Sequence, residues 1–271
     1  MHFTKMQTLG NDYLYVYGAP IHASELAIKL SDRHYGAGAD GMIWISPSAE
    51  ADFSMRIFNA DGTEAEMSGN GIRCVGKYVF DKGYTDQTTL KIDTLAGVRT
   101  LHLQVAYGKV ERVAVEMGKA IVSDDMTVTV GNQSFTGVPV NMGNPHFVIF
   151  ANDVESVPVA ELGAELSHHA AFAEGANIEF VQLMEDHSLR MRVWERGMGV
   201  TMACGTGACA AAAAAVKKGY CYGAKETFSS GLGGRPIKVK LDGGTLTITV
   251  SPDDSVTMTG PAEFVYEGET V

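Results

Sequence analysis

Cys204 stands where a helix is expected to begin. It precedes Gly205-Thr206-Gly207 and a run of alanines, Ala210 to Ala215, and the run is followed by Val216-Lys217-Lys218-Gly219. Basic residues in a last turn and a closing glycine are typical of a helix C-terminus. The unpaired N–H groups and the dipole at a helix N-terminus favour negative charge, so they can stabilise a thiolate and hold a substrate carboxylate beside it. The pattern predicts that Cys204 is a base or nucleophile, against the ordinary alternative of a small buried residue at a helix start.

The stretch that contains Cys204 occurs twice in the chain. Residues 55–71 align with residues 191–207 without a gap at a constant offset of 136, and Ser68 falls on Cys204. The Gly-x-Gly that follows is shared, and both copies reach a Lys-Gly pair at the same distance further on. This period far exceeds the roughly 20 to 50 residues of repeat arrays, so the sequence predicts two related lobes rather than a solenoid.

Two related helix N-termini, each with a small hydroxyl or thiol residue, indicate a shared site in a cleft between the lobes. Inversion at a stereocentre needs two acid/base groups on opposite faces of one carbon, because one removes the proton and the other returns it from the far side. The N–H groups of Gly69-Asn70-Gly71 and Gly205-Thr206-Gly207 can hold the substrate carboxylate and stabilise the carbanion. No pyridoxal phosphate site is legible in the sequence. The expected chemistry therefore needs no cofactor.

Each half of the sequence predicts mostly strands and one central helix. In the first half, strands are expected near residues 14–17, 42–45, 53–58, 89–92, 99–105 and 110–116, with helices near 25–34 and after Ser68. In the second half, strands are expected near residues 126–130, 147–150, 178–183, 189–194, 237–241, 245–250 and 255–259, with helices near 159–172 and after Cys204.

The two central helices are apolar or small on nearly all sides, and a helix of that kind must be surrounded. The expected fold class is therefore α+β, with two pseudo-symmetric lobes from an internal duplication. Each lobe is expected to be a curved, mostly antiparallel sheet wrapped around its central helix, with the active site in the cleft between lobes. The N-terminal lobe should cover residues 1–116, completed by 262–271, and the C-terminal lobe residues 117–261.

Composition and charge exclude several classes of protein. The chain has 271 residues, and its net charge of -11 argues against nucleic acid or an anionic membrane as partner. No segment has the roughly 18 apolar residues that span a bilayer, and the first residues lack the apolar core of a signal peptide. The four cysteines show no zinc-like CxxC spacing, so no metal site is expected. These features predict a cytoplasmic enzyme whose partner is a small molecule.

The chain resembles the diaminopimelate epimerase family over its whole length. The motifs that carry it are Gly10-Asn-Asp12, Asn59-Ala-Asp-Gly62, Gly69-Asn-Gly71 with Arg73-Cys74, Met142-Gly-Asn-Pro-His146, Ala176-Asn-Ile-Glu-Phe180, Glu195-Arg-Gly197 and Ala203-Cys-Gly-Thr-Gly-Ala208. The resemblance implies an isomerase that converts LL-diaminopimelate to the meso form, for lysine and cell-wall synthesis. It implies two cysteines that work as thiolate and thiol across the substrate's α-carbon.

The resemblance also implies roles for individual residues. Cys204 is the second catalytic cysteine, position 68 holds the first, and His146 and Glu195 tune the two catalytic side chains. The residues implied to bind substrate are Asn11, Asn59, Gly69, Asn70, Asn144, Asn177, Glu195, Arg196, Gly205 and Thr206. Arg196 is expected to hold the substrate's far carboxylate through two parallel hydrogen bonds. Tyr266 resembles a tyrosine that the family uses to form a homodimer, and an exposed tyrosine at a sheet edge is the ordinary alternative.

The chain departs from the family where the first catalytic cysteine is expected. Ser68 occupies that position, and a serine hydroxyl is harder to ionise than a thiol, whose ordinary pKa is about 8.5. Because the surrounding motif is intact, an engineered Cys→Ser substitution is the favoured interpretation, and a natural variant with altered chemistry is the alternative. Either way, the chain is expected to bind substrate and to turn it over poorly or not at all.

Two further hypotheses stay open beside a diaminopimelate epimerase. One is a related cofactor-free racemase of another amino acid, such as histidine. The far-end residues Asn59, Asn144, Asn177 and Arg196 count against it, because a shorter substrate leaves them unpaired. The other is an amino-acid-binding protein without catalytic activity.

Overall fold

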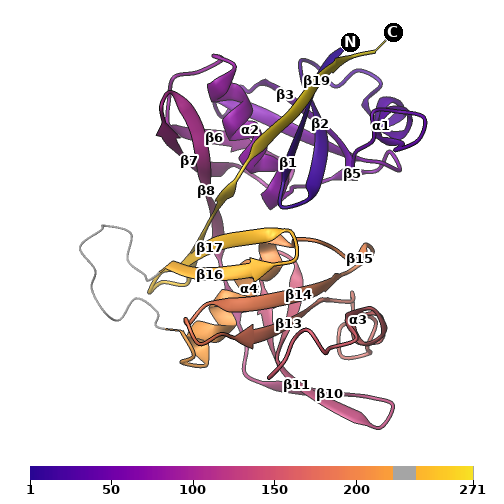
Figure 1. Cartoon of the computed structure of the whole chain (residues 1–271), viewed down its shortest axis with the longest axis vertical. Helices are drawn as coiled ribbons and strands as arrows, with labels where there is room; N and C mark the ends of the chain where they lie inside the picture. Colours follow the sequence, from indigo (N-terminus) through magenta and orange to yellow (C-terminus); the bar gives the residue numbers. More distant parts are fainter. Residues whose placement is uncertain (222–235, 271) are drawn as a thin grey trace. The chain divides into compact units, whose positions relative to one another are not determined.

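The protein is described here by a computed structural model that covers residues 1–221 and 236–270 (Figure 1). The helices are α1 (Ala23–Ser31), α2 (Gly69–Asp81), α3 (Val159–Ser167) and α4 (Gly205–Lys217). The chain divides into two compact units, of which one comprises Met1–Glu116 with Thr259–Val271 and the other Met117–Met258. The expected α+β fold class is confirmed.

Each unit contains its own series of strands. The strands that lie wholly in the N-terminal unit are β1 (His2–Thr8), β2 (Asn11–Tyr17), β3 (Gly41–Pro47), β4 (Phe53–Asn59), β5 (Glu64–Ala65), β6 (Thr89–Asp93), β7 (Arg99–Ala106) and β19 (Glu263–Glu269). Those of the C-terminal unit are β9 (Ile121–Val122), β10 (Met126–Val130), β11 (Gln133–Asn141), β12 (Pro145–Phe150), β13 (Asn177–Leu183), β14 (Leu189–Glu195), β15 (Gly199–Val200), β16 (Pro236–Leu241) and β17 (Gly244–Val250). The chain passes between the units within β8 (Lys109–Lys119) and β18 (Ser255–Pro261).

The two units repeat the same order of strand pairing. In the N-terminal unit, β2–β3 is parallel, β3–β4 antiparallel, β4–β6 parallel and β6–β7 antiparallel. The pairs β12–β13, β13–β14, β14–β16 and β16–β17 follow the same alternation in the C-terminal unit. The sequence duplication is therefore a duplication of topology.

In each unit, one helix packs on each face of the sheet. Because side chains alternate along a strand, neighbouring residues of the strand contact different helices. On β3, Met42 and Trp44 belong to the core cluster that includes Ala27 and Leu30 of α1. The intervening Ile43 points the other way, toward the start of α2. On β13, Ile178 and Phe180 pack in the cluster formed with α3, and the intervening Glu179 points toward the start of α4.

The alanine run of α4 allows this helix to lie close to strands on nearly every side. Ala208 and Ala210 to Ala215 are all buried, and α4 packs against β11, β12, β13, β14, β16 and β17. Small side chains permit a close approach of helix and strand, so an alanine-rich sequence suits a helix that is surrounded. In Figure 1, α4 lies among these strands of its unit.

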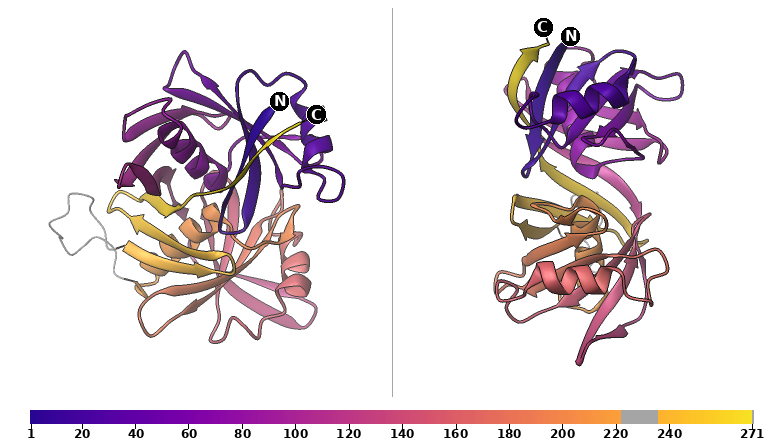
Figure 2. Two further views of the ribbon diagram at one scale, coloured as in Figure 1. Left: turned by 45° about the horizontal axis from the view of Figure 1, so that its top comes forward. Right: turned by 90° about the vertical axis from the view of Figure 1, so that its right-hand side faces the viewer.

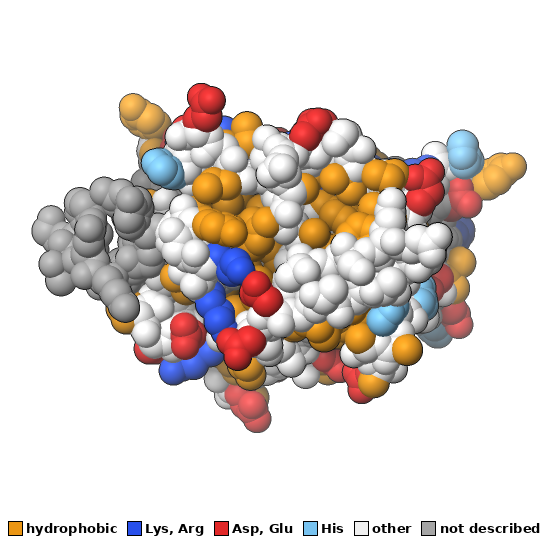
Figure 3. All heavy atoms as spheres, turned by 90° about the horizontal axis from the view of Figure 1, so that it is seen from below, with side chains coloured by type: hydrophobic (Ala, Val, Ile, Leu, Met, Phe, Trp, Pro, Cys, Tyr) orange, Lys and Arg blue, Asp and Glu red, His pale blue; other side chains and the backbone are white. Residues whose placement is uncertain are grey.

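Several details differ from the sequence prediction. The helix α3 ends at Ser167 rather than near Phe172, because Ala176 N–H donates to Ser167 O at 3.0 Å and Ser167 Oγ donates to Ala176 O at 2.7 Å. The helix α1 ends at Ser31, earlier than expected. Strands β1, β5, β9, β11, β15 and β19 were not predicted. Strand β11 pairs with β10. Figure 3 shows the molecule from the side where these two strands lie, and hydrophobic side chains gather on that face.

The last strand, β19, completes the N-terminal unit by pairing with β1. The two strands are antiparallel, with His2 opposite Glu269 and Lys5 opposite Tyr266. Figure 2 shows them side by side, with the two ends of the chain close together. Phe3 and Tyr266 pack edge to face, with ring centroids 6.1 Å apart.

Candidate active site

Cys204 caps the N-terminus of α4 with its sulfur. Its backbone is extended, at φ -107° and ψ 114°, which turns the side chain back toward the first turn of the helix. The Gly207 N–H donates to Cys204 Sγ at 3.3 Å, and Thr206 Oγ1 lies 3.6 Å from the same sulfur. The side chain is only 4% exposed. The sequence prediction that Cys204 stands at a helix start is confirmed.

The surroundings of Cys204 oppose the predicted stabilisation of a thiolate at this helix start. Burial raises the pKa of the Cys204 thiol well above its ordinary value, and the charges of Glu195 and Glu179 raise it further. Hydrogen bonds from Thr206 and Gly207 act in the opposite direction but contribute less. These surroundings favour the protonated form of Cys204, which suits a proton donor.

Glu195 lies beside Cys204 at the end of β14. Burial raises the pKa of its carboxyl, and hydrogen bonds with Thr201 and Cys204 offset part of that rise. Thr201 Oγ1 donates to Glu195 Oε1. The expectation that Glu195 tunes a catalytic side chain remains a prediction.

His146 is held from both ring nitrogens in the interior of the C-terminal unit. Its Nδ1 lies 2.7 Å from Glu179 Oε1, and its Nε2 lies 3.0 Å from Asn144 Oδ1. The other end of the Asn144 amide donates to Thr206 Oγ1 at 3.3 Å. The side chains of His146 and Glu179 are both fully buried.

Sequence reasoning did not single out Glu179, although it left a signal. Glu179 is the charged residue of the segment Asn177-Ile-Glu-Phe-Val181, whose members are all buried. Acidic residues are almost never fully buried unless they are paired. A glutamate inside such an apolar strand therefore indicates a buried partner, which the structure identifies as His146.

Asn177 and Arg196 meet at the edge of the sheet where β13 begins and β14 ends. The Arg196 N–H donates to Asn177 Oδ1 at 2.9 Å, and Asn177 Nδ2 donates to Pro145 O at 3.3 Å. The Arg196 guanidinium donates from Nη1 to Glu174 O at 2.7 Å. The predicted site residues Asn144, His146, Asn177, Glu195, Arg196, Cys204, Gly205 and Thr206 thus gather at the end of the unit where α4 begins.

The N-terminal unit builds a similar helix start around Ser68. The residue caps α2 with an extended backbone, at φ -132° and ψ 117°, and its Oγ accepts from Gly71 N–H at 3.0 Å. Asn70 Oδ1 accepts from Arg73 Nη2 at 3.0 Å. Ser68 Oγ and Cys204 Sγ therefore cap their helices in the same way.

The predicted asparagines of this unit lie at strand ends. Asn11 begins β2, and its Nδ2 donates to Asp40 Oδ2 at 2.7 Å. Asn59 ends β4, and its Nδ2 donates to Thr63 Oγ1 at 3.0 Å. Because Gly41 pairs with both Asn59 and Tyr13, these asparagines share the edge of the sheet. This unit brings together Asn11, Asn59, Ser68, Gly69 and Asn70.

Tyr266 lies apart from these residues, on β19. It is 40% exposed, and its hydroxyl donates to Ala37 O at 2.9 Å within the same chain. Its expected part in a dimer remains a prediction.

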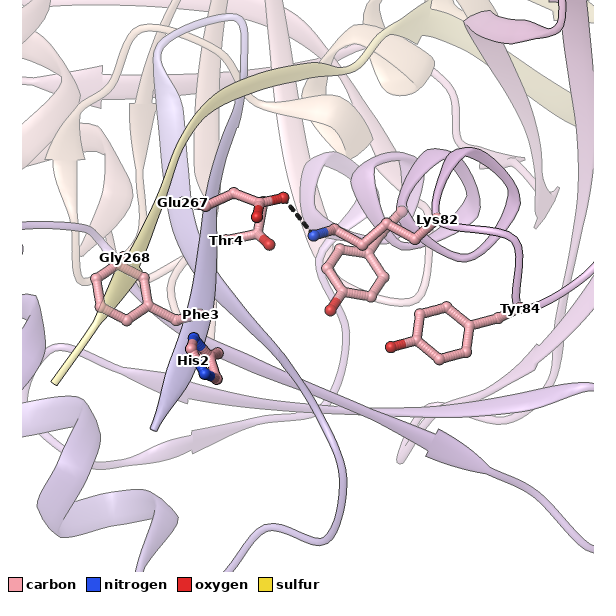
Figure 4. A pocket seen from close by; sticks show the side chains of 8 residues that line it. His2, Phe3, Thr4, Lys82, Tyr84, Glu267 and Gly268 are labelled. Atoms are coloured by element: carbon pink, nitrogen blue, oxygen red, sulfur yellow. Dashed lines mark hydrogen bonds and ion pairs between the residues drawn. The ribbon is translucent and has the colours of Figure 1, made fainter.

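Figure 4 shows a pocket of the N-terminal unit that contains none of the predicted site residues. Its lining comes from β1, β19 and the end of α2, and Lys82 and Glu267 form an ion pair across it. Within residues 1–221 and 236–270, no group of three or more His, Cys, Asp or Glu side chains could hold a metal ion. In the same part of the chain, no helix has the length and apolar character needed to span a membrane.

Comparison with known proteins agrees with this geometry. The model of the family described as diaminopimelate epimerase matches residues 3–122 and 138–265. A diaminopimelate epimerase of Methanococcus maripaludis is 44% identical over 286 aligned positions, which cover 99% of each chain. One of Phocaeicola vulgatus is 46% identical over 283 positions, covering 98% of this chain and 97% of the relative.

Solved structures show the same fold at much lower identity. A hydroxyproline epimerase from Agrobacterium vitis matches with a TM-score of 0.71 at 16% identity, and the match covers 99% of this chain and 91% of that one. The strand order, the two capped helix starts and the full-length similarity in sequence lead to one conclusion. The chain belongs to the diaminopimelate epimerase family and is an isomerase of that type.

Proposed function

We propose that the chain is built to invert the α-carbon of LL-diaminopimelate, giving the meso form, by proton transfer between residue 68 and Cys204. The observation that carries the proposal is the pair of helix starts, in which Ser68 Oγ and Cys204 Sγ each accept the N–H of the third residue on. We propose further that residue 68 and Cys204 act on the same α-carbon, one removing the proton and the other returning it.

In the proposed reaction, a base at position 68 takes the α-proton and leaves its electron pair on the substrate carbon. The N–H groups that follow residues 68 and 204 stabilise the carbanion through the substrate carboxylate. Cys204 then donates its Sγ–H proton to the opposite face of the carbon. The raised pKa of the Cys204 thiol supports this direction, because the residue holds a proton to donate. The substrate's original proton ends on residue 68, and Cys204 is left as the thiolate.

Ser68 weakens the first of these steps. A serine hydroxyl ionises far less readily than a thiol, and a helix N-terminus shifts such an equilibrium only modestly. We therefore propose that this chain is a Cys→Ser variant of an active enzyme that binds diaminopimelate but exchanges its α-proton slowly. A natural replacement at this position would have the same chemical effect.

The far end of the substrate is proposed to contact a second group of residues. Asn11, Asn59, Asn144 and Asn177 supply amide donors and acceptors, and Arg196 supplies a planar fork for a carboxylate. The Asn177 side chain already accepts from the Arg196 backbone N–H at 2.9 Å, which fixes the Asn177 amide beside the residue that carries the guanidinium. A substrate with a second amino-acid end would satisfy these groups, whereas a shorter one would leave them unpaired.

Three further assignments rest on the family alone. We propose that the enzyme acts in the cytoplasm, in lysine and cell-wall synthesis. We propose that it forms a homodimer in which Tyr266 takes part. The size of the particle in solution, measured for the parent chain and for Tyr266→Ala, tests the dimer.

The Ser68→Cys variant tests the proposed function directly. The measurement is α-proton exchange of LL-diaminopimelate in deuterated water, followed for the parent chain, for Ser68→Cys and for Ser68→Cys with Cys204→Ser. Restored exchange in Ser68→Cys that is lost again in the double variant supports the proposal. Exchange with histidine only would show a racemase of another amino acid. No exchange with either compound, together with tight binding, would show a protein that only binds amino acids.

A further inference from the structure

A buried charged pair lies directly beneath the helix start that holds Cys204. Because side chains alternate along β13, Glu179 points toward α4, whereas its neighbours Ile178 and Phe180 pack on the opposite face of the sheet. A Cβ added to Gly207 would lie 2.7 Å from Glu179 Oε1 and 3.2 Å from Cys204 Sγ. Glu179 therefore approaches the first turn of α4 as closely as a side chain can, and only the lack of a side chain at Gly207 permits it.

From this carboxylate, hydrogen-bonded side chains lead to the sulfur. The successive distances are 2.7 Å from Glu179 to His146, 3.0 Å from His146 to Asn144, 3.3 Å from Asn144 to Thr206 and 3.6 Å from Thr206 to Cys204. Every member belongs to the C-terminal unit. The series connects residues of β12, β13 and α4 that are far apart in the sequence.

The direction of these hydrogen bonds defines the state of the histidine. Asn144 donates to Thr206 from Nδ2, which turns its Oδ1 toward the ring. Nε2 of His146 then donates to Asn144 Oδ1, and Nδ1 faces the Glu179 carboxyl at 2.7 Å. A carboxylate on the Nδ1 side of a histidine fixes the orientation and tautomer of the ring, as in the serine protease triad.

One oxygen of the buried Glu179 side chain, Oε2, makes no hydrogen bond to the described residues. Burying a charged carboxylate with one oxygen unsatisfied is costly, and an apolar side chain at the same place would avoid that cost. The C-terminal unit nevertheless has a glutamate here, which points to a role other than stability.

We propose that Glu179 is a positioning residue of the reaction: it holds His146, and through His146 the amide of Asn144 and the hydroxyl of Thr206, in the arrangement that presents a proton-donating Cys204 to the substrate. This inference rests on the proposed function for its kinetic consequence. The placement of the histidine ring does not depend on that function.

The replacement Glu179→Gln removes the charge and keeps the shape. Glu165→Gln is the matched control, because Glu165 is an exposed residue of α3. The first measurement is the nuclear magnetic resonance spectrum of isotope-labelled histidine in the full chain, with the His146 signals identified by their absence in His146→Phe. We expect the ring-nitrogen signals of His146 to shift in Glu179→Gln, because the partner of Nδ1 changes from a carboxyl to an amide, and to stay unchanged in the control.

The second measurement is the rate of α-proton exchange in the Ser68→Cys background. We expect Glu179→Gln to lower kcat by roughly 100-fold with little change in KM, because a slightly misplaced proton donor costs rate rather than binding. A residue with only a structural role would change the unfolding midpoint and leave the split between kcat and KM unaffected. The control variant is expected to match its parent in both constants.

Two results would overturn the inference. One is a His146 spectrum that Glu179→Gln leaves unchanged, and the other is an unchanged kcat in the Ser68→Cys background. If Ser68→Cys itself shows no exchange with LL-diaminopimelate, the proposed function fails, and the histidine spectrum alone then decides whether Glu179 positions the ring.

Discussion

The capping residues of α2 and α4 have similar backbone conformations, but different side chains pack against the first turns of the two helices. At the start of α2, a Cβ on Gly71 would meet Ile43 at 2.6 Å, and at the start of α4, a Cβ on Gly207 would meet Glu179 at 2.7 Å. Ile43 and Glu179 are separated by the same offset of 136 as Ser68 and Cys204. The duplication thus kept the N–H groups that can hold a carboxylate and changed the side chain that supports them.

The charges around the two starts have opposite signs. Near its start, α2 contains Arg73, which is fully buried and donates to Gly69 O at 2.9 Å and to Thr8 Oγ1 at 2.6 Å. The position 136 residues on is the buried, uncharged Cys209. A cation favours an anionic base, whereas the Glu179 and Glu195 carboxylates favour a protonated acid. The comparison teaches that the duplicated helix starts have different electrostatic surroundings, which agrees with the proposed proton acceptor at residue 68 and proton donor at Cys204.

The largest effect is expected when Glu179 loses its hydrogen-bond partner, His146. The replacement His146→Phe leaves a buried charge unpaired, and we expect it to destabilise the protein by about 3 to 5 kcal/mol. Adding Glu179→Ile, which installs the residue of the N-terminal unit, should recover most of that loss. Urea unfolding of the two variants measures both values. A double variant as unstable as His146→Phe would show that the charge is not the cause.

A smaller effect is expected from a methyl group at either helix start. Gly207→Ala forces its Cβ against the Glu179 carboxylate and Cys204, and overpacking of this kind costs about 1 to 3 kcal/mol. Gly71→Ala meets the end of the Ile43 side chain, which can rotate away, so its cost should be lower. Unfolding midpoints of the two variants test the order. Equal losses would mean that the glutamate is as adaptable as the isoleucine.

The opposite charges also predict a difference in thiol reactivity. In Ser68→Cys, the introduced thiol should be alkylated at lower pH than Cys204, because Arg73 favours its thiolate while burial and two carboxylates raise the pKa of Cys204. Mass spectrometry of alkylated peptides across a pH series gives both profiles. The buried Cys74, whose pKa burial raises to about 11, serves as an unreactive reference. Reaction of Cys204 first would contradict the assignment of donor and acceptor.

The smallest expected effect concerns Glu195 and pH. Burial raises the pKa of Glu195 above its unfolded value of 4.5, so the folded protein binds more protons than the unfolded chain in the window just above that pH. The contribution of Glu195 to stability therefore falls as pH rises through this window. Glu195→Gln should remove the fall, and its stability relative to the parent should rise with pH. A constant difference across the series would show that burial does not perturb this carboxyl.

The sequence alone determined the fold class, the duplication and the special place of residues 68 and 204. These features are visible because they are local: an alanine run predicts a helix, a Gly-x-Gly marks its start, and an ungapped repeat reveals two copies. Strands β1, β11 and β19 and the early end of α3 were missed, since they depend on pairing with other segments.

Only the tertiary structure decided the ionisation of Cys204 and the role suggested for Glu179. Both depend on the parallel pairing of β12 with β13, which places His146 and Glu179 beside each other beneath the first turn of α4. A helix N-terminus by itself favours a thiolate, and the sequence therefore predicted one. Burial and two nearby carboxylates outweigh that preference, and both are set by contacts between segments that are distant in the chain.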